Sequence, residues 1–296
     1  MSTFTAVDLS RLPLPDVFEQ LDFEQLLARR VDQFRTFMPE YDALVESDPV
    51  YKVLQVSAYN ELILREQFNQ RAKGLFLAYA QRGDLDNLAA PFGVTRKQLA
   101  PADPEAGTPA EFETDTEFRR RIQLAPEGLS VAGPEGAYIF HTLSADNAVL
   151  DASATSPAPG EVVVTVLARD GDGTPSDSLL ATVNAVLQDG QVRPLTDFVR
   201  VVGAQILPYV VEADLYTFDG PDAAVVIAEA RRRLEAFMAD SHRLGRDVAV
   251  SAIYAQLHAE GVQRVVLHAP VADLAVERHQ AAYCTALTLK HRGSNE

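Results

Sequence analysis

The sequence contains a single cysteine, Cys284, among its 296 residues. It therefore cannot form an intrachain disulfide bond or a zinc site built from several cysteines. Its apolar stretches, such as residues 162–168, are far shorter than the roughly 20 residues that a membrane-spanning helix requires. The first residues lack the basic and apolar regions of a secretory signal peptide. We therefore expect a protein that folds in the cytoplasm and does not insert into a membrane.

Positive charge is also scarce. The chain has 26 lysine and arginine residues against 42 aspartate and glutamate residues, which gives a net charge of −16. Such a chain is repelled by a phosphate backbone, so we expect no nucleic-acid partner. Hydrophobic residues make up 47% of the sequence and charged residues 23%, as in a folded globular protein. At roughly 150 residues per domain, the length predicts about two domains.

The common motifs of catalysis are missing as well. The chain has neither the Gly-x-Ser-x-Gly motif of hydrolases nor a phosphate-binding loop, and none of its six histidines has the spacing of a metal-binding pair. We therefore predict no catalytic, cofactor-binding or metal-binding residue. The alternative is a soluble cytoplasmic metal-dependent hydrolase with a site assembled from distant residues, for which the candidates are His242, His258 and Asp247.

The first 83 residues have the apolar spacing of helices. The first helix is expected to stop at Pro39, and its apolar face consists of Phe23, Leu27, Val31 and Phe34. The second is expected to begin at Asp48-Pro49 and to run to Gly83 over about 50 Å. Its apolar stripe includes Val50, Leu54, Leu62 and Phe76. A helix this long packs within its own domain or, as we favour, in a bundle shared with partner chains.

Shorter elements follow. The Pro/Ala/Glu-rich segment 100–110 is expected to be an extended linker. Residues 114–117 (TDTE) fit a capping box that opens a helix through Ile122, and Pro134 is expected to begin another helix. Two arginine triplets occupy residues 119–121 and 231–233. Successive helical residues point about 100° apart, so we expect these arginines to form separate ion pairs, within the chain or across an interface.

From residue 148 onward, strands alternate with helices. Strands are predicted at 148–155, 161–169, 198–205, 210–218, 262–268 and 282–289. A helix over about 221–240 is expected to face inward with Val225, Ala228, Leu234 and Phe237, and a shorter helix at 251–260 contains Tyr254. The predicted fold class is α+β, with an all-helical N-terminal region that contains a long helix, followed by two small α/β sandwich-like modules.

We divide the chain into four parts. Residues 1–83 are predicted to form an N-terminal helical bundle that packs with companion chains, and residues 84–147 a region of short helices and linker. Residues 148–205 are predicted to form a central α+β module. Residues 206–296 are predicted to form a C-terminal α+β module.

An ordered set of phrases runs along the whole chain. They are DLSRLP at 8–13, GDLDNL at 83–88, FGV at 92–94, DTEFRRRI at 115–122, GLSVAG at 128–133, GAY at 136–138, TSPAPG at 155–160, VRPLTD at 192–197, LGRD at 244–247 and GVQRV at 261–265. Together they resemble the baseplate assembly protein J family of contractile-tailed phages and R-type tailocins (pyocins). The order and spacing agree along essentially the whole chain.

The resemblance implies a structural role without a cofactor. Family members are baseplate wedge subunits, and two copies join one baseplate I-like companion to form a triplex. Six wedges close into a ring around the central spike, and widening of this ring is thought to release sheath contraction. The expected partners are a second copy of the chain, the baseplate I-like protein, a baseplate W-like sheath initiator, and the central spike and hub proteins. Tail-fibre attachment is expected to be indirect. The resemblance also implies that the C-terminal α+β part pairs neighbouring copies, so residues 206–296 are expected to be a dimerisation module.

We therefore expect interface residues rather than an active site. The predicted interface residues are Phe23, Leu27, Val31, Phe34, Val50, Leu54, Leu62, Phe76, Arg119, Arg231, Arg232 and Tyr254. Segment 100–110 and the Gly133-Pro134 junction are the predicted places at which the chain absorbs a change of conformation. Assembly is expected in the bacterial cytoplasm, and the finished protein is expected in the baseplate of a released phage or tailocin particle.

Overall fold

A computed structural model describes residues 9, 12–13, 15–41, 44–130, 132–219 and 222–294. Half of the phrase at 8–13, together with Val131 and Pro221, lies outside the described residues. The described chain forms two compact units. The N-terminal unit contains the described residues up to Arg96 and Thr114–Arg119, and the sheet unit contains Lys97–Glu113 and the chain from Arg120 onward. Helices and three small sheets together confirm the predicted α+β class.

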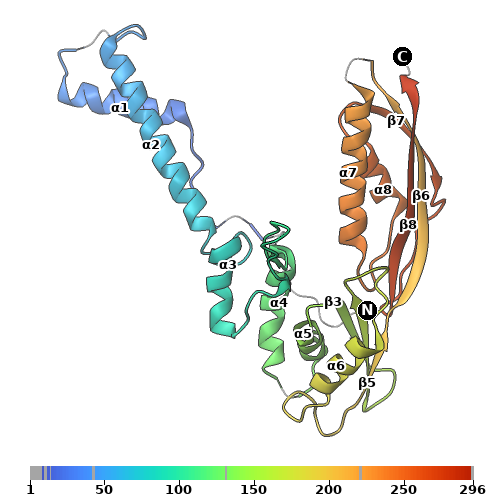
Figure 1. Ribbon diagram of the computed structural model, residues 1–296. Helices are drawn as coiled ribbons and strands as arrows, with labels where there is room; N and C mark the ends of the chain where they lie inside the picture. The colour runs from blue at the N-terminus through green and yellow to red at the C-terminus, as the bar shows by residue number, and fades with distance from the viewer. Residues whose placement is uncertain are drawn as a thin grey trace. The chain divides into compact units, whose positions relative to one another are not determined.

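The N-terminal unit is helical. It contains α1 (Phe23–Phe37), α2 (Pro49–Lys73), α3 (Arg82–Ala89) and the short 3-10 helix η2 (Ala90–Phe92), and α1 crosses α2 (Figure 1). The side chain of Asp22 accepts the backbone N–H of Gln25 at 3.0 Å, and Asp48 accepts that of Val50 at 2.8 Å. These carboxylates satisfy backbone donors that have no partner within the helix, so they fix where α1 and α2 begin.

Helix α2 ends ten residues before the predicted stop at Gly83, so that prediction is wrong. At Gly74 the backbone bonds shorten to the i→i−3 type, since its N–H donates to the carbonyl of Arg71 at 3.1 Å. A Cβ atom at Gly74 would lie 2.5 Å from a carboxylate oxygen of Asp84, a residue of α3. The first turn of α3 thus lies close to the end of α2, and Gly83 lies inside α3 rather than at a helix end.

Segment 100–110 is a turn of a hairpin rather than an extended linker, so this prediction is also wrong. Strand β1 (Gln98–Ala100) pairs antiparallel with β2 (Glu111–Phe112). Between them, Asp103 and Thr108 exchange two backbone hydrogen bonds of 3.0 Å. The Asp103 carboxylate accepts the N–H groups of Glu105 and Ala106, and Gly107 adopts a positive φ of 68°. The aspartate side chain accepts backbone N–H groups inside the turn, and the glycine adopts the positive φ that the turn requires.

Helix α4 (Asp115–Gly128) begins at the predicted capping box. The backbone N–H of Glu117 donates to Thr114 Oγ1 at 3.3 Å, and the N–H of Thr114 donates to the Glu117 carboxylate at 3.4 Å. Helix α5 (Glu135–Ala145) begins directly after Pro134, as expected.

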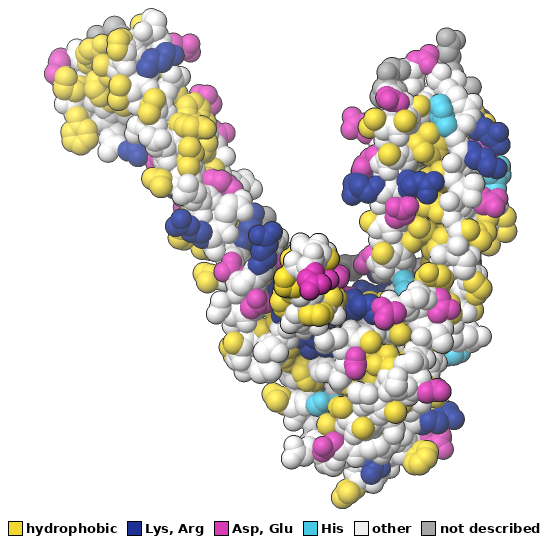
Figure 2. All heavy atoms as spheres, viewed as in Figure 1, with side chains coloured by type: hydrophobic (Ala, Val, Ile, Leu, Met, Phe, Trp, Pro, Cys, Tyr) yellow, Lys and Arg dark blue, Asp and Glu magenta, His cyan; other side chains and the backbone are white. Residues whose placement is uncertain are grey.

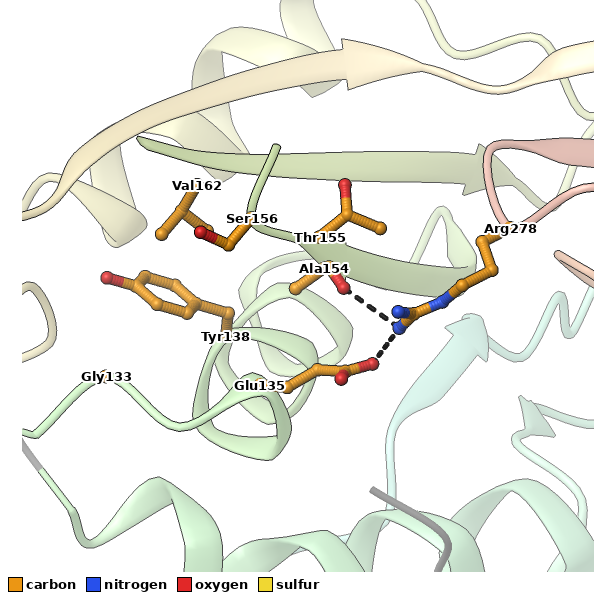
Figure 3. Close-up of a pocket in the computed structure, with 8 residues that line it drawn as sticks. All are labelled: Gly133, Glu135, Tyr138, Ala154, Thr155, Ser156, Val162 and Arg278. Atoms are coloured by element: carbon orange, nitrogen blue, oxygen red, sulfur yellow. Dashed lines mark hydrogen bonds and ion pairs between the residues drawn. The ribbon is translucent and has the colours of Figure 1, made fainter. Parts of the chain in front are cut away.

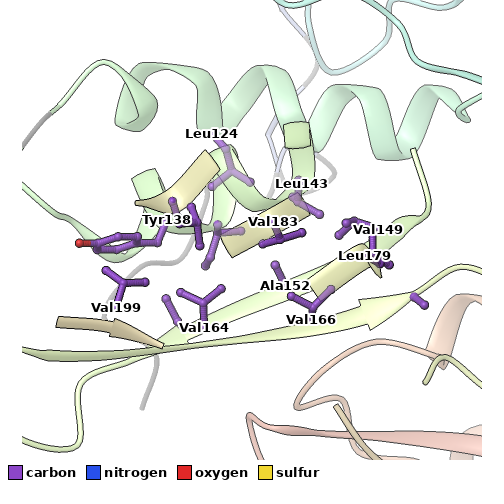
Figure 4. Packing of buried hydrophobic residues seen from close by; sticks show 14 residues of the cluster. Leu124, Tyr138, Leu143, Val149, Ala152, Val164, Val166, Leu179, Val183 and Val199 are labelled. Atoms are coloured by element: carbon purple, nitrogen blue, oxygen red, sulfur yellow. The ribbon is translucent and has the colours of Figure 1, made fainter. Parts of the chain in front are cut away.

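The central module is a three-stranded sheet with helices on one face. The strand order is β3-β4-β5, with β3 (Val149–Thr155) antiparallel and β5 (Phe198–Gly203) parallel to β4 (Glu161–Ala168). Helix α6 (Asp177–Leu187) connects the parallel strands. Side chains of α4, α5 and α6 meet those of the strands in one apolar cluster (Figure 4), in which Val164, Val183 and Leu187 are fully buried.

The C-terminal module repeats this plan with a second sheet. Its order is β7-β6-β8, with β7 (Val262–Ala269) antiparallel and β8 (Gln280–Ser294) parallel to β6 (Gln205–Thr217). Helices α7 (Ala223–Ser241) and α8 (Val250–Leu257) cover one face (Figure 1). Strand β6 therefore begins five residues before the predicted start of its strand, and β5 ends before Gln205.

The buried face of α7 is rotated relative to the prediction. Val226, Ala230 and Leu234 are buried, whereas Val225 is 66% exposed and Ala228 is exposed. The prediction for Leu234 is confirmed, and those for Val225 and Ala228 are wrong. The first turns of α7 are almost entirely apolar, so no polar residue marks which side faces the solvent.

Candidate interaction surfaces

Helices α1 and α2 share one apolar contact. Leu26, Leu27 and Ala58 are buried there, and five half-buried residues pack around them: Phe23, Val31, Tyr51, Leu54 and Leu62. Five of the predicted interface residues therefore lie in the contact between α1 and α2. Their further contact with a partner chain stays a prediction.

Helix α2 has a second apolar face. Val53, Val56, Leu64 and Phe68 are 67%, 60%, 66% and 59% exposed. Val53 and the buried Ala58 are five residues apart, which places them about 140° apart around the helix axis. One side of α2 thus packs on α1, and the other presents large apolar side chains to solvent. We call the four residues Val53, Val56, Leu64 and Phe68 the outer face of α2.

The outer face borders a shallow groove with polar walls. The groove is lined by Arg30, Val53, Val56, Ser57, Asn60, Glu61 and Leu64, and hydrophobic side chains gather on the visible side of this helix pair (Figure 2). Arg30 of α1 contacts Glu61 of α2 at 2.6 Å, and Arg65 contacts the same carboxylate at 2.8 Å. Burial alone would raise the pKa of Glu61, but the hydrogen bonds and charges of Arg65 and Arg30 hold that pKa below its usual range.

The remaining predicted residues of the N-terminal unit make contacts inside that unit. The Phe34 ring lies 5.7 Å from Tyr41, and the Phe76 ring 5.8 Å from Phe18, between ring centroids. Val50, in the first turn of α2, is half-buried. The Arg119 guanidinium donates to the carbonyls of Leu77 and Ala80 at 2.7 and 2.6 Å, and so holds the turns that follow α2.

The other arginines of the two triplets pair with carboxylates. Arg120 contacts Asp151 and Arg121 contacts Glu113, both at 2.7 Å. On α7, Arg231 contacts Glu235 at 3.6 Å and Arg232 contacts Glu229 at 2.7 Å, and opposite charges lie side by side there (Figure 2). Five of the six arginines therefore pair with carboxylates within the chain, as predicted. Arg119 departs from the prediction because it binds backbone carbonyls, and Arg232 and Arg233 share the carboxylate of Glu229. Tyr254 of α8 packs half-buried against the core of the C-terminal module.

Nothing in the described residues supports the hydrolase alternative. Within them, no group of three or more His, Cys, Asp or Glu side chains could hold a metal ion. His242 Nδ1 lies 2.7 Å from the carbonyl of Ala282, and Asp247 accepts the N–H of Val276 at 2.7 Å. Burial raises the pKa of the Cys284 thiol, which disfavours the reactive thiolate.

A cavity of about 250 Å³ opens beside the central sheet (Figure 3). It is lined by Gly133, Glu135, Tyr138, Ala154, Thr155, Ser156, Val162 and Arg278. Tyr138 Oη donates to the Asp197 carboxylate at 2.8 Å, and burial, with that hydrogen bond, raises the pKa of Tyr138 above its usual range. Four of the phrases noted in the sequence, at 128–133, 136–138, 155–160 and 192–197, thus contribute residues to this cavity and its border. Local sequence patterns could not show that they meet.

Comparisons with known proteins place the chain in a family. Profiles of the baseplate J-like N-terminal domain and the baseplate J-like central domain match residues 46–103 and 130–203. The chain is 46% identical to baseplate protein J of Escherichia phage P2 over 299 residues, covering 98% of this chain and 99% of that protein. It belongs to the baseplate J family. A chain in the anti-feeding prophage baseplate, solved by cryo-electron microscopy, has a TM-score of 0.40 and 15% identity, covering 60% of this chain and 42% of that one.

As a baseplate J family member, the chain is a structural component of a baseplate, which confirms the resemblance seen in the sequence. The family points to a role that is not enzymatic. The N-terminal family domain contains α2 and α3, and the central one extends from the loop before α5 to β5. No helix among the described residues is long and apolar enough to cross a bilayer.

The sequence predictions for this baseplate J chain missed the outer face of α2. Val53, Val56 and Leu64 recur at spacings of three and eight residues, which is a helical pattern. The same helix carries a second apolar pattern that includes Leu54 and Leu62. Two apolar patterns on opposite sides of one helix indicate that a neighbouring element or chain packs against each side. This signal was present in the sequence.

Proposed function

We propose that this chain is a wedge subunit of a contractile-tail baseplate and that its work is to hold neighbouring subunits in place. Two copies join one baseplate I-like companion in a triplex, and six such wedges surround the central spike. Widening of the ring releases sheath contraction. The outer face of α2 is the observation that supports this proposal most directly, because it presents four large, exposed apolar side chains on a chain of the baseplate J family.

The outer face of α2 is the surface on which we propose that the companion chains pack. Each large apolar side chain that becomes fully buried contributes about 1.5–3 kcal/mol. Covering Val53, Val56, Leu64 and Phe68 would therefore stabilise a complex by several kcal/mol before the entropy cost of association. The neighbouring pair Arg30 and Glu61 gives this surface a polar rim.

The rest of the assignment follows the family. We propose that the C-terminal module pairs neighbouring copies, that the baseplate W-like initiator and the spike and hub proteins are further neighbours, and that tail fibres attach indirectly. Assembly takes place in the bacterial cytoplasm. The four-part division at residues 83, 147 and 205 and the twelve predicted interface residues are kept as proposals.

The experiment is co-purification of the chain with its baseplate I-like companion, both expressed together. The Val56→Asp, Leu64→Asp double variant is expected to weaken the complex by more than about 100-fold, equivalent to about 2.7 kcal/mol. Val45→Asp is the matched control, because Val45 is 58% exposed but lies before α2. Unchanged binding of the double variant would contradict the proposed surface.

The wedge role itself is tested by electron microscopy of particles from a strain that lacks this gene, with a complemented control. We expect missing baseplates, absent tails, or tubes that have lost their sheath. Complete and contractile tails from the deletion strain would refute the role.

A further inference from the structure

The two modules of the sheet unit have separate cores. One apolar cluster belongs to the central module and another to the C-terminal module, and no described residue belongs to both. The chain passes from one to the other through a single residue, Ala204, between the end of β5 at Gly203 and the start of β6 at Gln205. Each module can therefore keep its own core if the angle between the two changes.

Hydrogen bonds from β3 reach loops of the C-terminal module. The Asp151 carboxylate, whose side chain is 3% exposed, accepts the backbone N–H of Leu244 at 3.0 Å. Ser153 Oγ donates to the carbonyl of Arg278 at 2.6 Å. These contacts join residues 93 and 125 positions apart in the sequence.

Arg278 makes the most direct link. Its guanidinium reaches from the loop before β8 into the cavity of Figure 3, where it forms an ion pair with Glu135 of α5. The same nitrogen donates to the carbonyl of Ala154 at 2.9 Å. One side chain of the C-terminal module thus binds both a helix and a strand of the central module.

Gly245 allows residues 244–247 to lie close to the loop that carries Arg278. Gly245 has a positive φ of 68°, and a Cβ atom there would lie 3.3 Å from the Cα atom of Arg278. The backbone N–H of Gly245 also donates to the carbonyl of Gln280 at 3.0 Å. The phrase LGRD at 244–247 therefore positions both Leu244 and Arg278 against the central sheet.

We propose that Asp151, Ser153, Glu135 and Arg278 form a releasable polar latch between the two modules, and that residues 203–205 are the hinge about which the C-terminal module turns. Water can replace hydrogen bonds and an ion pair when they separate, whereas separating a shared apolar core would expose that core. The latch is a property of the chain itself, so its test does not depend on the proposed baseplate role.

The test measures the distance between the modules in the full-length chain. Spin labels are attached at Ala181→Cys on α6 and Ala236→Cys on α7, both exposed positions, in a Cys284→Ser background. Double electron–electron resonance then gives the distribution of distances. We expect one narrow distribution for the latched chain. Arg278→Glu and Glu135→Arg are each expected to raise the ratio of open to closed molecules by about tenfold or more.

The double variant Glu135→Arg, Arg278→Glu is expected to return the distribution toward the narrow one, because it restores an ion pair of reversed polarity. Arg292→Glu is the matched control: Arg292 of β8 pairs with Asp214 of β6 at 3.0 Å inside the C-terminal module, so its distribution should not change. Ser153→Ala tests the latch without altering charge and should broaden the distribution less. Unchanged distances in both charge-reversal variants, or a double variant as broad as the single ones, would overturn the proposal.

Discussion

Replacing Arg121 by methionine is expected to destabilise the sheet unit strongly. The guanidinium of Arg121, on α4, donates two hydrogen bonds of 2.7 and 3.2 Å to the carboxylate of Glu113, which follows β2. The two side chains are only 8% and 2% exposed. The same carboxylate accepts the backbone N–H of Lys97 at 2.8 Å. This buried pair therefore joins the base of the hairpin to the helix.

The expected loss in the free energy of unfolding follows from the Glu113 carboxylate, which stays buried when Arg121 is replaced. Arg121→Met leaves a buried carboxylate without its cation, which costs about 3–5 kcal/mol. Adding Glu113→Gln removes that charge and keeps an oxygen that can accept the N–H of Lys97. The double variant is therefore expected to recover at least about half of the lost free energy of unfolding.

The assay is urea unfolding followed by circular dichroism. Arg232→Met is the control, because the Arg232–Glu229 pair is exposed and such pairs contribute less than about 1 kcal/mol. Two results would refute the reasoning: a loss below about 1 kcal/mol for Arg121→Met, or a double variant that is less stable than this single variant.

Three further outcomes are expected. Burial lowers the pKa of Lys97 to about 8 in the folded chain, so the unfolded chain holds this proton more strongly. The free energy of unfolding should therefore rise by up to about 3 kcal/mol between pH 8 and 10.5. In urea titrations, Lys97→Met should abolish that part of the rise. Leu234→Ala should cost about 2–5 kcal/mol and the exposed Val225→Ala less than about 0.5 in the same assay, and equal losses would contradict the observed face of α7. Gly74→Ala should change the melting temperature little, because Gly74 has helical dihedrals (φ −62°, ψ −17°) and its Cβ would meet the end of the Asp84 side chain, which can move; a large decrease would show that α3 requires this glycine.

Local sequence signals determined where several helices begin. Asp48 with Pro49 and Thr114 with Glu117 place donors and acceptors within three residues of one another, so the contact that starts the helix is made by the segment itself. The same holds for Ser176, which accepts the N–H of Leu179 at 3.2 Å at the start of α6. The ordered phrases also determined the family, because they extend along the whole chain.

Tertiary contacts decided which faces of the helices are buried. At the end of α2, the Asp84 carboxylate of α3 lies beside Gly74, a contact that no local pattern shows. The covered side of α2 depends on α1, since both sides of α2 are apolar. Which side of α7 is buried depends in the same way on the sheet that it covers, because its first turns are apolar on every side. A helical pattern gives the spacing of apolar residues, but it does not say which neighbour covers them.

The junction between the modules shows this limit most clearly. The sequence determined that acidic and basic residues occur, that glycines mark turns, and that two sheet modules follow a helical region. Only the folded chain brings Arg278 to Glu135, which lies 143 positions away. Such a pair leaves no local periodicity, because its geometry is set by how two whole sheets pack around a one-residue connection.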